Sequence, residues 1–261
     1  MSIWSDYTFV NKMNDVLKLK NISKNFGGVE ALTGIDLNLS KGECLGLMGD
    51  NGAGKSTLIK IIAGNYLPSG GKIFLNENEV IFNKPVDAQQ KGVEVVYQDL
   101  ALCDNLRAYE NVYLGRWLVK FKIGPFSFVD FKKMKEESKN LFKELKSDTR
   151  SNQLVKTLSG GQKQAVALSR TRLSNPDIVL MDEPTAAISI KQVKEVLQYI
   201  LKLKEKNIAI ILISHRMMDV FEVCDRVMVL RRGSKVSDKK ITNTNPEEVT
   251  GLITGAIDTS F

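Results

Sequence analysis

Hydrophobic and polar residues follow two different patterns along this chain. The segments VLKLKNISKNF, GIDLNLSKGE and GKIFLNENEVIF, between residues 16 and 82, alternate apolar and polar positions and are separated by turn residues. This alternation predicts half-exposed antiparallel strands. The segments ECLGLMG, DIVLMDEP, IAIILISH and DRVMVLRRG are continuously apolar and have the length of buried strands.

Helical patterns follow the continuously apolar strands. A helix is predicted over residues 55–63, ended by Gly64 and Pro68. Strands of this kind alternating with helices predict a mostly parallel sheet covered on both faces. Residues 99–157 are helical and charged in pattern, without strong strand runs.

The predicted fold is therefore α/β. It combines a mostly parallel core sheet with an N-terminal antiparallel β subdomain and an inserted α-helical subdomain. The predicted divisions are an extension over 1–15, the antiparallel part with the first part of the core over 16–98, the helical subdomain over 99–160, and the rest of the core over 161–261.

The amino-acid composition excludes several classes of protein but does not identify a function. Hydrophobic residues make up 43% of the 261 residues and charged residues 26%, as in an ordinary globular protein. The net charge is +7, but the lysines are interleaved with acids, which favours a solvated surface over a nucleic-acid site. No apolar run approaches the length of a membrane span. The N-terminus lacks the basic start and the long apolar core of a secretory signal, and we interpret residues 1–15 as a short extension. Cys44, Cys103 and Cys224 form no CxxC, so we expect neither bridges nor zinc, in a reducing compartment.

The segment GDNGAGKST matches the phosphate-binding pattern GxxxxGK followed by Ser or Thr. It stands between a predicted strand and a predicted helix, which is the context that the P-loop requires. Its backbone N–H groups would wrap phosphates, Lys55 would reach the β and γ oxygens, and Ser56 would ligate Mg²⁺. The predicted nucleotide-binding residues of this loop are Gly49, Asp50, Asn51, Gly52, Ala53, Gly54, Lys55, Ser56 and Thr57.

Further polar residues follow the ends of the predicted core strands, where functional groups of such sheets gather. Asp182 would bind Mg²⁺ directly or through water, and Glu183 would orient or deprotonate an attacking water. His215, the single histidine, would contact the γ-phosphate and hold that water. Gln98, in VVYQD, would reach Mg²⁺ or water.

A second candidate anion site lies about a hundred residues after the P-loop. The segment KTLSGGQKQ places a hydroxyl and two glycines before a helical pattern, which leaves N–H groups open at a helix N-terminus. The residues of this site are Leu158, Ser159, Gly160, Gly161 and Gln162.

These motifs together resemble the ATP-binding subunit of an ABC transporter, from about Val16 onwards. In that resemblance Gly49–Thr57 is Walker A, Gln98 the Q-loop glutamine, Leu158–Gln162 the signature, Asp182 and Glu183 the Walker B acids, and His215 the switch histidine. Phe26 matches the aromatic position that stacks on adenine. The resemblance as a whole, rather than this residue, implies ATP as the substrate and Mg²⁺ as the cofactor.

One position departs from the family pattern. The D-loop after Walker B usually reads Ala-Leu-Asp, whereas this chain has Ala187-Ile188-Ser189. A serine cannot supply the same carboxylate across a dimer interface. DEPTAAISIKQ nevertheless resembles the D-loop of simple-sugar importers, and other segments, including GQKQAVALSR and the closing LITGA, resemble the same branch of the family.

The resemblance implies a peripheral subunit at the cytoplasmic face of the cell membrane. Its expected partners are a second copy or a homologous ATP-binding subunit, transmembrane permease subunits that dock near residues 97–115, and, indirectly, a periplasmic or lipid-anchored solute-binding protein. Each ATP would lie between the P-loop of one subunit and the signature of the other. Monosaccharide import is the expected function. Import of nucleosides, autoinducer or amino acids, a non-transport ABC ATPase, and a binding module without hydrolysis are the alternatives. The chain would be a single-domain member of this branch or half of a tandem protein.

Overall fold

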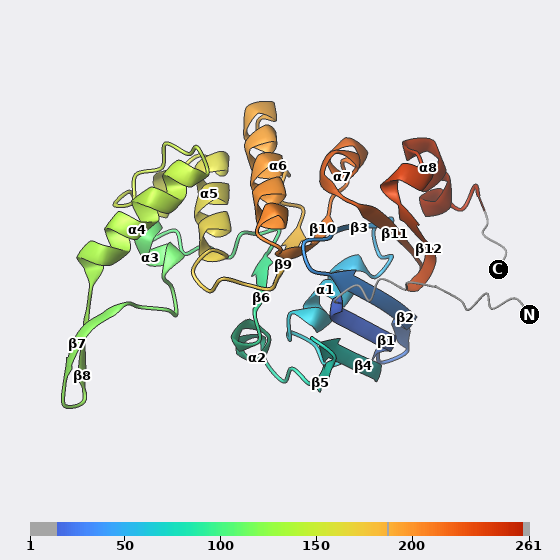
Figure 1. The fold of residues 1–261 in the computed structure, drawn as a ribbon, viewed down its shortest axis with the longest axis horizontal. Coiled ribbons are helices and arrows are strands. Elements are labelled where there is room, and N and C mark those ends of the chain that lie inside the picture. The colour runs from blue at the N-terminus through green and yellow to red at the C-terminus, as the bar shows by residue number, and fades with distance from the viewer. Residues whose placement is uncertain (1–14, 187, 258–261) are drawn as a thin grey trace, which may run out of the picture.

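The computed structural model describes residues 15–186 and 188–257. The predicted extension over 1–15 lies outside these residues except for Asp15, which begins the first strand. Two large sheets, a two-stranded hairpin and a group of helices make up the described chain (Figure 1). The strands are β1 Asp15–Phe26, β2 Val29–Ser40, β3 Cys44–Met48, β4 Gly70–Leu75, β5 Asn78–Val80, β6 Val93–Val96, β7 Val119–Ile123, β8 Phe126–Val129, β9 Ile178–Asp182, β10 Ala209–Ile213, β11 Arg226–Arg231 and β12 Ser234–Lys240. The α-helices are α1 Lys55–Ile62, α2 Pro85–Gln90, α3 Ala108–Val112, α4 Phe131–Glu144, α5 Gly160–Arg170, α6 Ile190–Glu205, α7 Met217–Val223 and α8 Pro246–Thr254.

The core sheet has the strand order β12-β11-β3-β10-β9-β6. All neighbours in it pair in parallel except β11 with β12. Strands β3, β9 and β10 are buried at every residue, because helices and the second sheet cover both faces. The predicted mostly parallel sheet is confirmed.

The N-terminal strands form an antiparallel sheet in the order β2-β1-β4-β5. Burial along β2 and β4 alternates, as the sequence pattern predicts. Asn76 and Glu77, both with positive φ, form the tight turn between β4 and β5. The predicted antiparallel subdomain is confirmed.

Two apolar clusters fill the space on either side of the core sheet. One lies between the core sheet, α1 and the antiparallel sheet, and the other packs the opposite sheet face against α6, α7 and α8 (Figure 1). The predicted helix over residues 55–63 is α1, and Gly64 ends it with a φ of 76°. The aligned strand ends of this core position the candidate site.

The inserted subdomain has its own apolar cluster, built around α3, α4 and α5. It also contains a β-hairpin, β7–β8, which corrects the interpretation of residues 99–157 as lacking strands. Apolar residues at 119, 121 and 123 alternate with lysines, and Gly124-Pro125 forms the turn, so the strand signal was present but short.

Two of the cysteines meet in the core although 180 residues separate them. The sulfurs of Cys44 and Cys224 lie 3.4 Å apart, and both residues are buried as free thiols. Burial, and then the hydrogen bond with Cys44, raise the pKa of the Cys224 thiol. Along residues 15–186 and 188–257, every helix is too short or too polar to cross a membrane.

Candidate functional site

The order of the core strands brings the predicted catalytic groups to one edge of the sheet. Strands β3, β10, β9 and β6 are neighbours, and their carboxyl ends lead into Lys55, His215, Glu183 and Gln98 respectively. The ends are in register, because Leu47 pairs with Ile213 and Ile213 with Asp182. A cavity of about 360 Å³ opens there, lined by Ala31, Asn51 to Thr57, Gln98, Glu183 and His215.

The P-loop wraps closely around its own lysine. Lys55 is 7% exposed, and its Nζ donates to the carbonyls of Gly49 at 2.7 Å and Asp50 at 2.9 Å. Gly54, with a φ of 103°, precedes α1 and provides no side-chain cap. A Cβ on Gly54 would lie 2.7 Å from the Ala31 carbonyl oxygen, so the turn requires glycine. The uncapped N–H groups of α1 therefore face the cavity as an anion site.

Burial disfavours the charged forms of Lys55, which lines the cavity, and of Asp182 beside it. It lowers the pKa of Lys55, against the attraction of Glu183 and Asp182, which acts to raise it. Burial and the negative charge of Glu183 raise the pKa of Asp182, while a hydrogen bond with Ser56 and the charge of Lys55 lower it. A cation bound beside Asp182 would relieve this cost, because it compensates the buried carboxylate.

The hydroxyl of Ser56 and the carboxylate of Asp182 are hard oxygen donors that lie within hydrogen-bond reach of each other. Mg²⁺ takes one or two such protein ligands and completes its shell with phosphate oxygens and water. The described residues hold no cluster of three or more His, Cys, Asp or Glu side chains for a metal, and a Mg²⁺–nucleotide site does not need one. These two residues fit the ion.

Glu183 is the centre of a small polar cluster at the cavity wall. Its two carboxylate oxygens face His215 Nε2 at 2.7 Å and Gln98 Nε2 at 3.3 Å. Glu183 has a φ of 53°, which is uncommon for a residue with a side chain, and its N–H donates to the Ile213 carbonyl. This backbone turn directs the carboxylate toward His215, and Gln98 reaches the acid rather than Asp182.

The sequence motifs did not predict one contact that supports the site, between Thr185 and Asp219. Thr185 Oγ1 donates to Asp219 Oδ2 at 2.7 Å, and both side chains are buried. The bond ties the loop that carries Glu183 to α7, which follows His215. Thr185 in DEPT and Asp219 in HRMMD lie near the motifs, but only the fold reveals that they meet.

Phe26 does not line the cavity. Its ring, 43% exposed, contacts Tyr66 edge-on at 5.3 Å, and Lys24 Nζ lies 5.1 Å from the ring centroid. The ring therefore keeps an open side at the end of β1. Adenine stacking on Phe26 stays a prediction.

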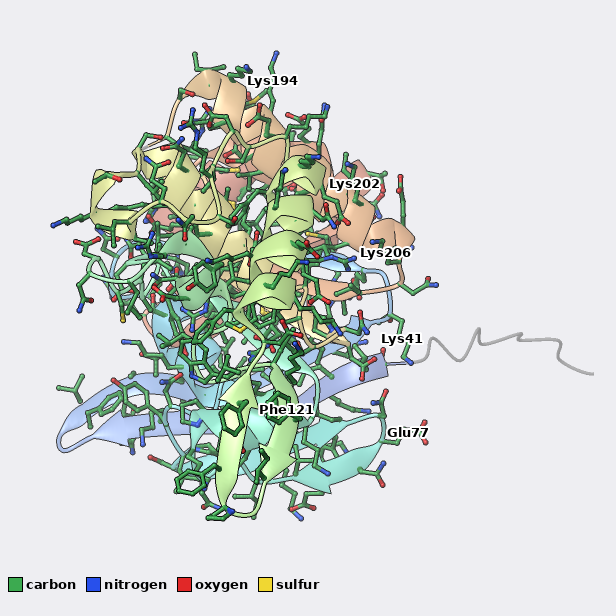
Figure 2. All side chains as sticks on the ribbon, turned by 90° about the vertical axis from the view of Figure 1, so that its left-hand side faces the viewer. Lys41, Glu77, Phe121, Lys194, Lys202 and Lys206 are labelled. Carbon is green, nitrogen blue, oxygen red and sulfur yellow. The ribbon has the colours of Figure 1, made fainter. Side chains whose placement is uncertain are left out.

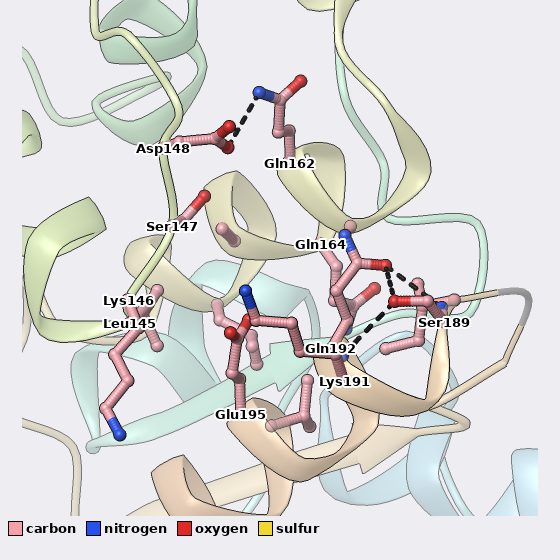
Figure 3. A pocket seen from close by; sticks show the side chains of 15 residues that line it. Leu145, Lys146, Ser147, Asp148, Gln162, Gln164, Ser189, Lys191, Gln192 and Glu195 are labelled. Carbon is pink, nitrogen blue, oxygen red and sulfur yellow. Dashed lines mark hydrogen bonds between the residues drawn. The ribbon is translucent and has the colours of Figure 1, made fainter.

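The signature segment also lies outside the cavity. Ser159 begins α5 as its N-cap, with Ser159 Oγ accepting from the Gln162 N–H and Gln162 Oε1 from the Ser159 N–H. Gln162 Nε2 also donates to Asp148 (Figure 3). Ser159 and Gly160 are exposed, so the structure places this second anion site at the surface and apart from the P-loop of its own chain.

The D-loop serine begins a helix. Ser189 is the N-cap of α6, and Gln192 Oε1 accepts from both its N–H at 3.1 Å and its hydroxyl at 3.0 Å. Figure 3 shows these contacts in a pocket of about 280 Å³ between α6 and the signature helix. A Cβ on Gly161 would lie 1.7 Å from Gln192 Nε2. The serine thus replaces the usual aspartate with an equally good cap, while Ala187 lies outside the described residues.

A sequence profile described as "ABC transporter" matches residues 32–186, more than half of the chain. The chain belongs to the ABC transporter family. As a member of this family the cassette is an ATP-binding protein and an ATPase, and its α/β fold with antiparallel and helical subdomains is confirmed.

Relatives and solved structures agree with this assignment. The cassette is 44% identical over 243 residues to the xylose/arabinose import ATP-binding protein XylG of Sulfolobus acidocaldarius, covering 93% of the chain and 95% of that protein. It is 39% identical to the ribose import protein RbsA of Caldanaerobacter subterraneus, again over 93% of the chain but only 48% of the relative. The chain thus spans about half the length of several relatives.

Among solved structures, an ATP-binding cassette of an ABC transporter in its ADP conformation matches with a TM-score of 0.75 at 25% identity, covering 92% of this chain and 95% of the other. A dimeric cassette in a post-hydrolysis state with ADP and Pi also matches with a TM-score of 0.75, at 26% identity over 86% and 98% of the two chains.

Proposed function

We propose that this cassette binds and hydrolyses ATP to power the import of a monosaccharide. The observation that carries the ATPase site is the single cavity into which the P-loop, Gln98, Glu183 and His215 converge. The sugar is proposed from the relatives, whose names specify xylose and arabinose, ribose, or galactose and methyl galactoside.

Each side chain at the cavity has a chemical role in this proposal. The open N–H groups of α1 and the Lys55 ammonium bind the phosphates. Ser56 and Asp182 would hold Mg²⁺, which neutralises charge on the β and γ oxygens. Glu183, an acceptor with access to the cavity, takes or orients a proton of the attacking water, and His215 and Gln98 fix its carboxylate.

The complete site requires a second subunit. Gly161 and Gln162 of the signature line a different pocket from the P-loop, and none of the signature residues lines the P-loop cavity, so the N–H groups of α5 do not face a nucleotide bound in their own chain. They are exposed and positioned for a nucleotide held by a partner, which is a second copy or a homologous subunit. The match to dimeric cassettes supports this pairing.

A groove beside the Q-loop offers the docking place for a permease. It has a volume of about 200 Å³ and is lined by residues of α2, β6 and the C-terminal half of α5. Leu100 and Ala101 form part of its wall. Arg116 pairs with Glu94 at 2.8 Å, and Arg170 donates to the Ala101 carbonyl at 3.0 Å, so cations line it. It overlaps the predicted docking segment over 97–115. Permease subunits bound there would hold the cassette at the cytoplasmic face of the membrane, and a solute-binding protein would act on it only through them.

Replacement of Glu183 with glutamine tests the catalytic assignment. A glutamine keeps the size of the side chain but cannot accept a proton, so turnover should fall by a factor of about 10² to 10⁴ while ATP binding persists. Dimers should accumulate with ATP, as measured by size-exclusion chromatography. Glu205→Gln, an exposed change at the end of α6, is the matched control. Normal ATP hydrolysis by the Glu183→Gln variant would contradict the assignment of Glu183 as the catalytic base.

Replacement of Ser159 with arginine tests the composite site. An arginine at the exposed cap fills the space for a partner's nucleotide, so hydrolysis should cease while ATP affinity of the monomer is unchanged. A large loss of monomer affinity would mean that the signature serves its own P-loop. Cargo is tested separately, by uptake of labelled pentoses and hexoses into vesicles with the co-purified complex; a complex that transports a nucleoside or an amino acid instead would contradict the sugar assignment.

A further inference from the structure

The β7–β8 hairpin has an apolar face that nothing in the described chain covers. Phe121 and Ile123 share this face through the two-residue alternation of β7, and the register places Phe128 opposite Phe121 and Phe126 opposite Ile123. A register shift between Val119 and Phe121 separates Val119 from this face. The rings of Phe121 and Phe128 stack with centroids 4.6 Å apart. Ile123 and Phe126, next to the turn, are 61% and 69% exposed. Isolated two-stranded hairpins are marginal in water, so an exposed apolar face on one indicates a binding surface.

The hairpin is fixed at its base and free at its tip. Leu118 and Val129 pack on the helical cluster, and the Asp130 N–H donates to the Leu118 carbonyl at 2.8 Å. Figure 1 shows the strands projecting from the insertion, away from α6, α7 and α8. Figure 2 shows the same hairpin facing the viewer, with Phe121 on it. The apolar face is thus presented outward on a short arm.

Lysines surround this apolar face. Lys120 and Lys122 occupy the alternate positions of β7, and residues 117–135 contain five lysines against one aspartate, Asp130. Asp130 is engaged as the N-cap of α4. Within residues 15–186 and 188–257, Lys120, Lys122 and Lys132 have no acidic partner. The hairpin itself carries two lysines and no acidic residue, so it is amphipathic and cationic, and the other three lysines lie at the start of α4.

Two large aromatic residues stand where the arm joins the body. Trp117 and Phe131 contact each other edge-on at 6.3 Å, and they are 41% and 47% exposed. Tryptophan is enriched at the level of lipid headgroups, where its ring meets both apolar and polar surroundings. Apolar residues that insert and lysines that remain outside are the composition of interfacial membrane anchors.

We propose that the β7–β8 hairpin inserts its apolar face into the headgroup region of an anionic bilayer. Charge decides between this occupant and the others. A second copy would bring its own Lys120 and Lys122 to the same place, and the cytoplasmic loops of permeases are themselves enriched in Lys and Arg. Anionic headgroups supply the opposite charge and attract each nearby lysine. The arm starts at Val119, three residues after Arg116, and Arg116 lines the groove proposed for the permease. Only this last point rests on the proposed function.

Vesicle binding by the full chain, without permease or nucleotide, tests the hairpin independently of the transport function. The protein should sediment with vesicles of 30% phosphatidylglycerol in phosphatidylcholine, bind pure phosphatidylcholine far more weakly, and be released by salt. Lys120→Glu with Lys122→Glu should weaken binding by at least about 25-fold, since one lysine near an anionic surface contributes about fivefold. Ile123→Ser with Phe126→Ser should weaken it at least about tenfold, because each apolar side chain loses its burial.

Two control variants test whether the loss of vesicle binding is specific to the hairpin. Lys202→Glu with Lys206→Glu makes the same charge change at the end of α6 and on the cap residue that follows it (Figure 2). Ile81→Ser removes an apolar side chain outside the hairpin that is 70% exposed. Both should bind like the parent, and ATPase activity should be normal in all variants. A Trp4→Phe background leaves Trp117 as the only tryptophan, and its emission should shift to the blue with anionic vesicles. Absence of vesicle binding, equal binding by the hairpin variants, or hairpin variants that lose only co-purification with a permease would overturn the proposal.

Discussion

The contact between the signature helix and the D-loop helix makes a prediction that can be worked out from the structure. In a Gly161→Ala variant the new methyl group would lie 1.7 Å from Gln192 Nε2, so the Gln192 side chain must move. Its Oε1 then no longer accepts from the Ser189 N–H and hydroxyl. The loss of this half of the capping box should cost about 1 kcal/mol.

Helix propensity acts in the opposite direction. Replacing glycine with alanine in a helix contributes up to about 1 kcal/mol, so Gly161→Ala should change the unfolding free energy little in the parent protein. In a Gln192→Ala background the space is open and the bonds to Ser189 are already absent. There the same change should stabilise the protein by up to about 1 kcal/mol.

Urea unfolding of the four proteins, followed by circular dichroism at 222 nm, measures this coupling. The double-mutant cycle should give an interaction energy of about 1 kcal/mol, because the two side chains compete for the same place. Additive effects, within about 0.5 kcal/mol, would refute the reasoning and mean that Gln192 can move away from residue 161 without cost.

Three further predictions address the buried groups. Lys55→Ala should weaken ATP binding in titrations with a fluorescent analogue; unchanged affinity would count against the P-loop assignment. Burial raises the pKa of Asp182, so the folded protein binds the carboxyl proton more tightly than the unfolded chain does. The free energy of unfolding therefore decreases as the pH rises from the ordinary pKa of 3.8 through the raised pKa of the folded state. Asp182→Asn should therefore raise the melting temperature at pH 7 and show a smaller gain near pH 4, in scanning calorimetry; a gain that grows toward acid would contradict the shift. A disulfide reagent should modify the partly exposed Cys103 quickly and reach Cys44 and Cys224 only on unfolding, and equal rates for all three thiols would disprove their burial.

Much of the fold was predictable because its signals are local. The alternation in the N-terminal strands and the continuous apolar runs of β3, β9 and β10 reflect burial on one face or on both. The missed hairpin shows the limit of this reasoning. Its apolar residues alternate as in any strand, but no core covers them, and its short length within a charged helical region weakened the signal.

The chemistry of this protein is specified by short motifs in its amino-acid sequence. The P-loop is recognised from the spacing of its glycines, lysine and serine. Two acids follow one apolar strand, and a histidine follows another. Each of these patterns is local, because neighbouring residues specify the backbone of each turn. Only the tertiary structure decided which of these groups meet. The order β3-β10-β9-β6 brings Gln98 and His215 to Glu183, the start of α6 explains the serine of the D-loop, and the signature is kept away from the P-loop of its own chain. These contacts join residues far apart in the chain, and the packing of whole elements sets them rather than any local pattern.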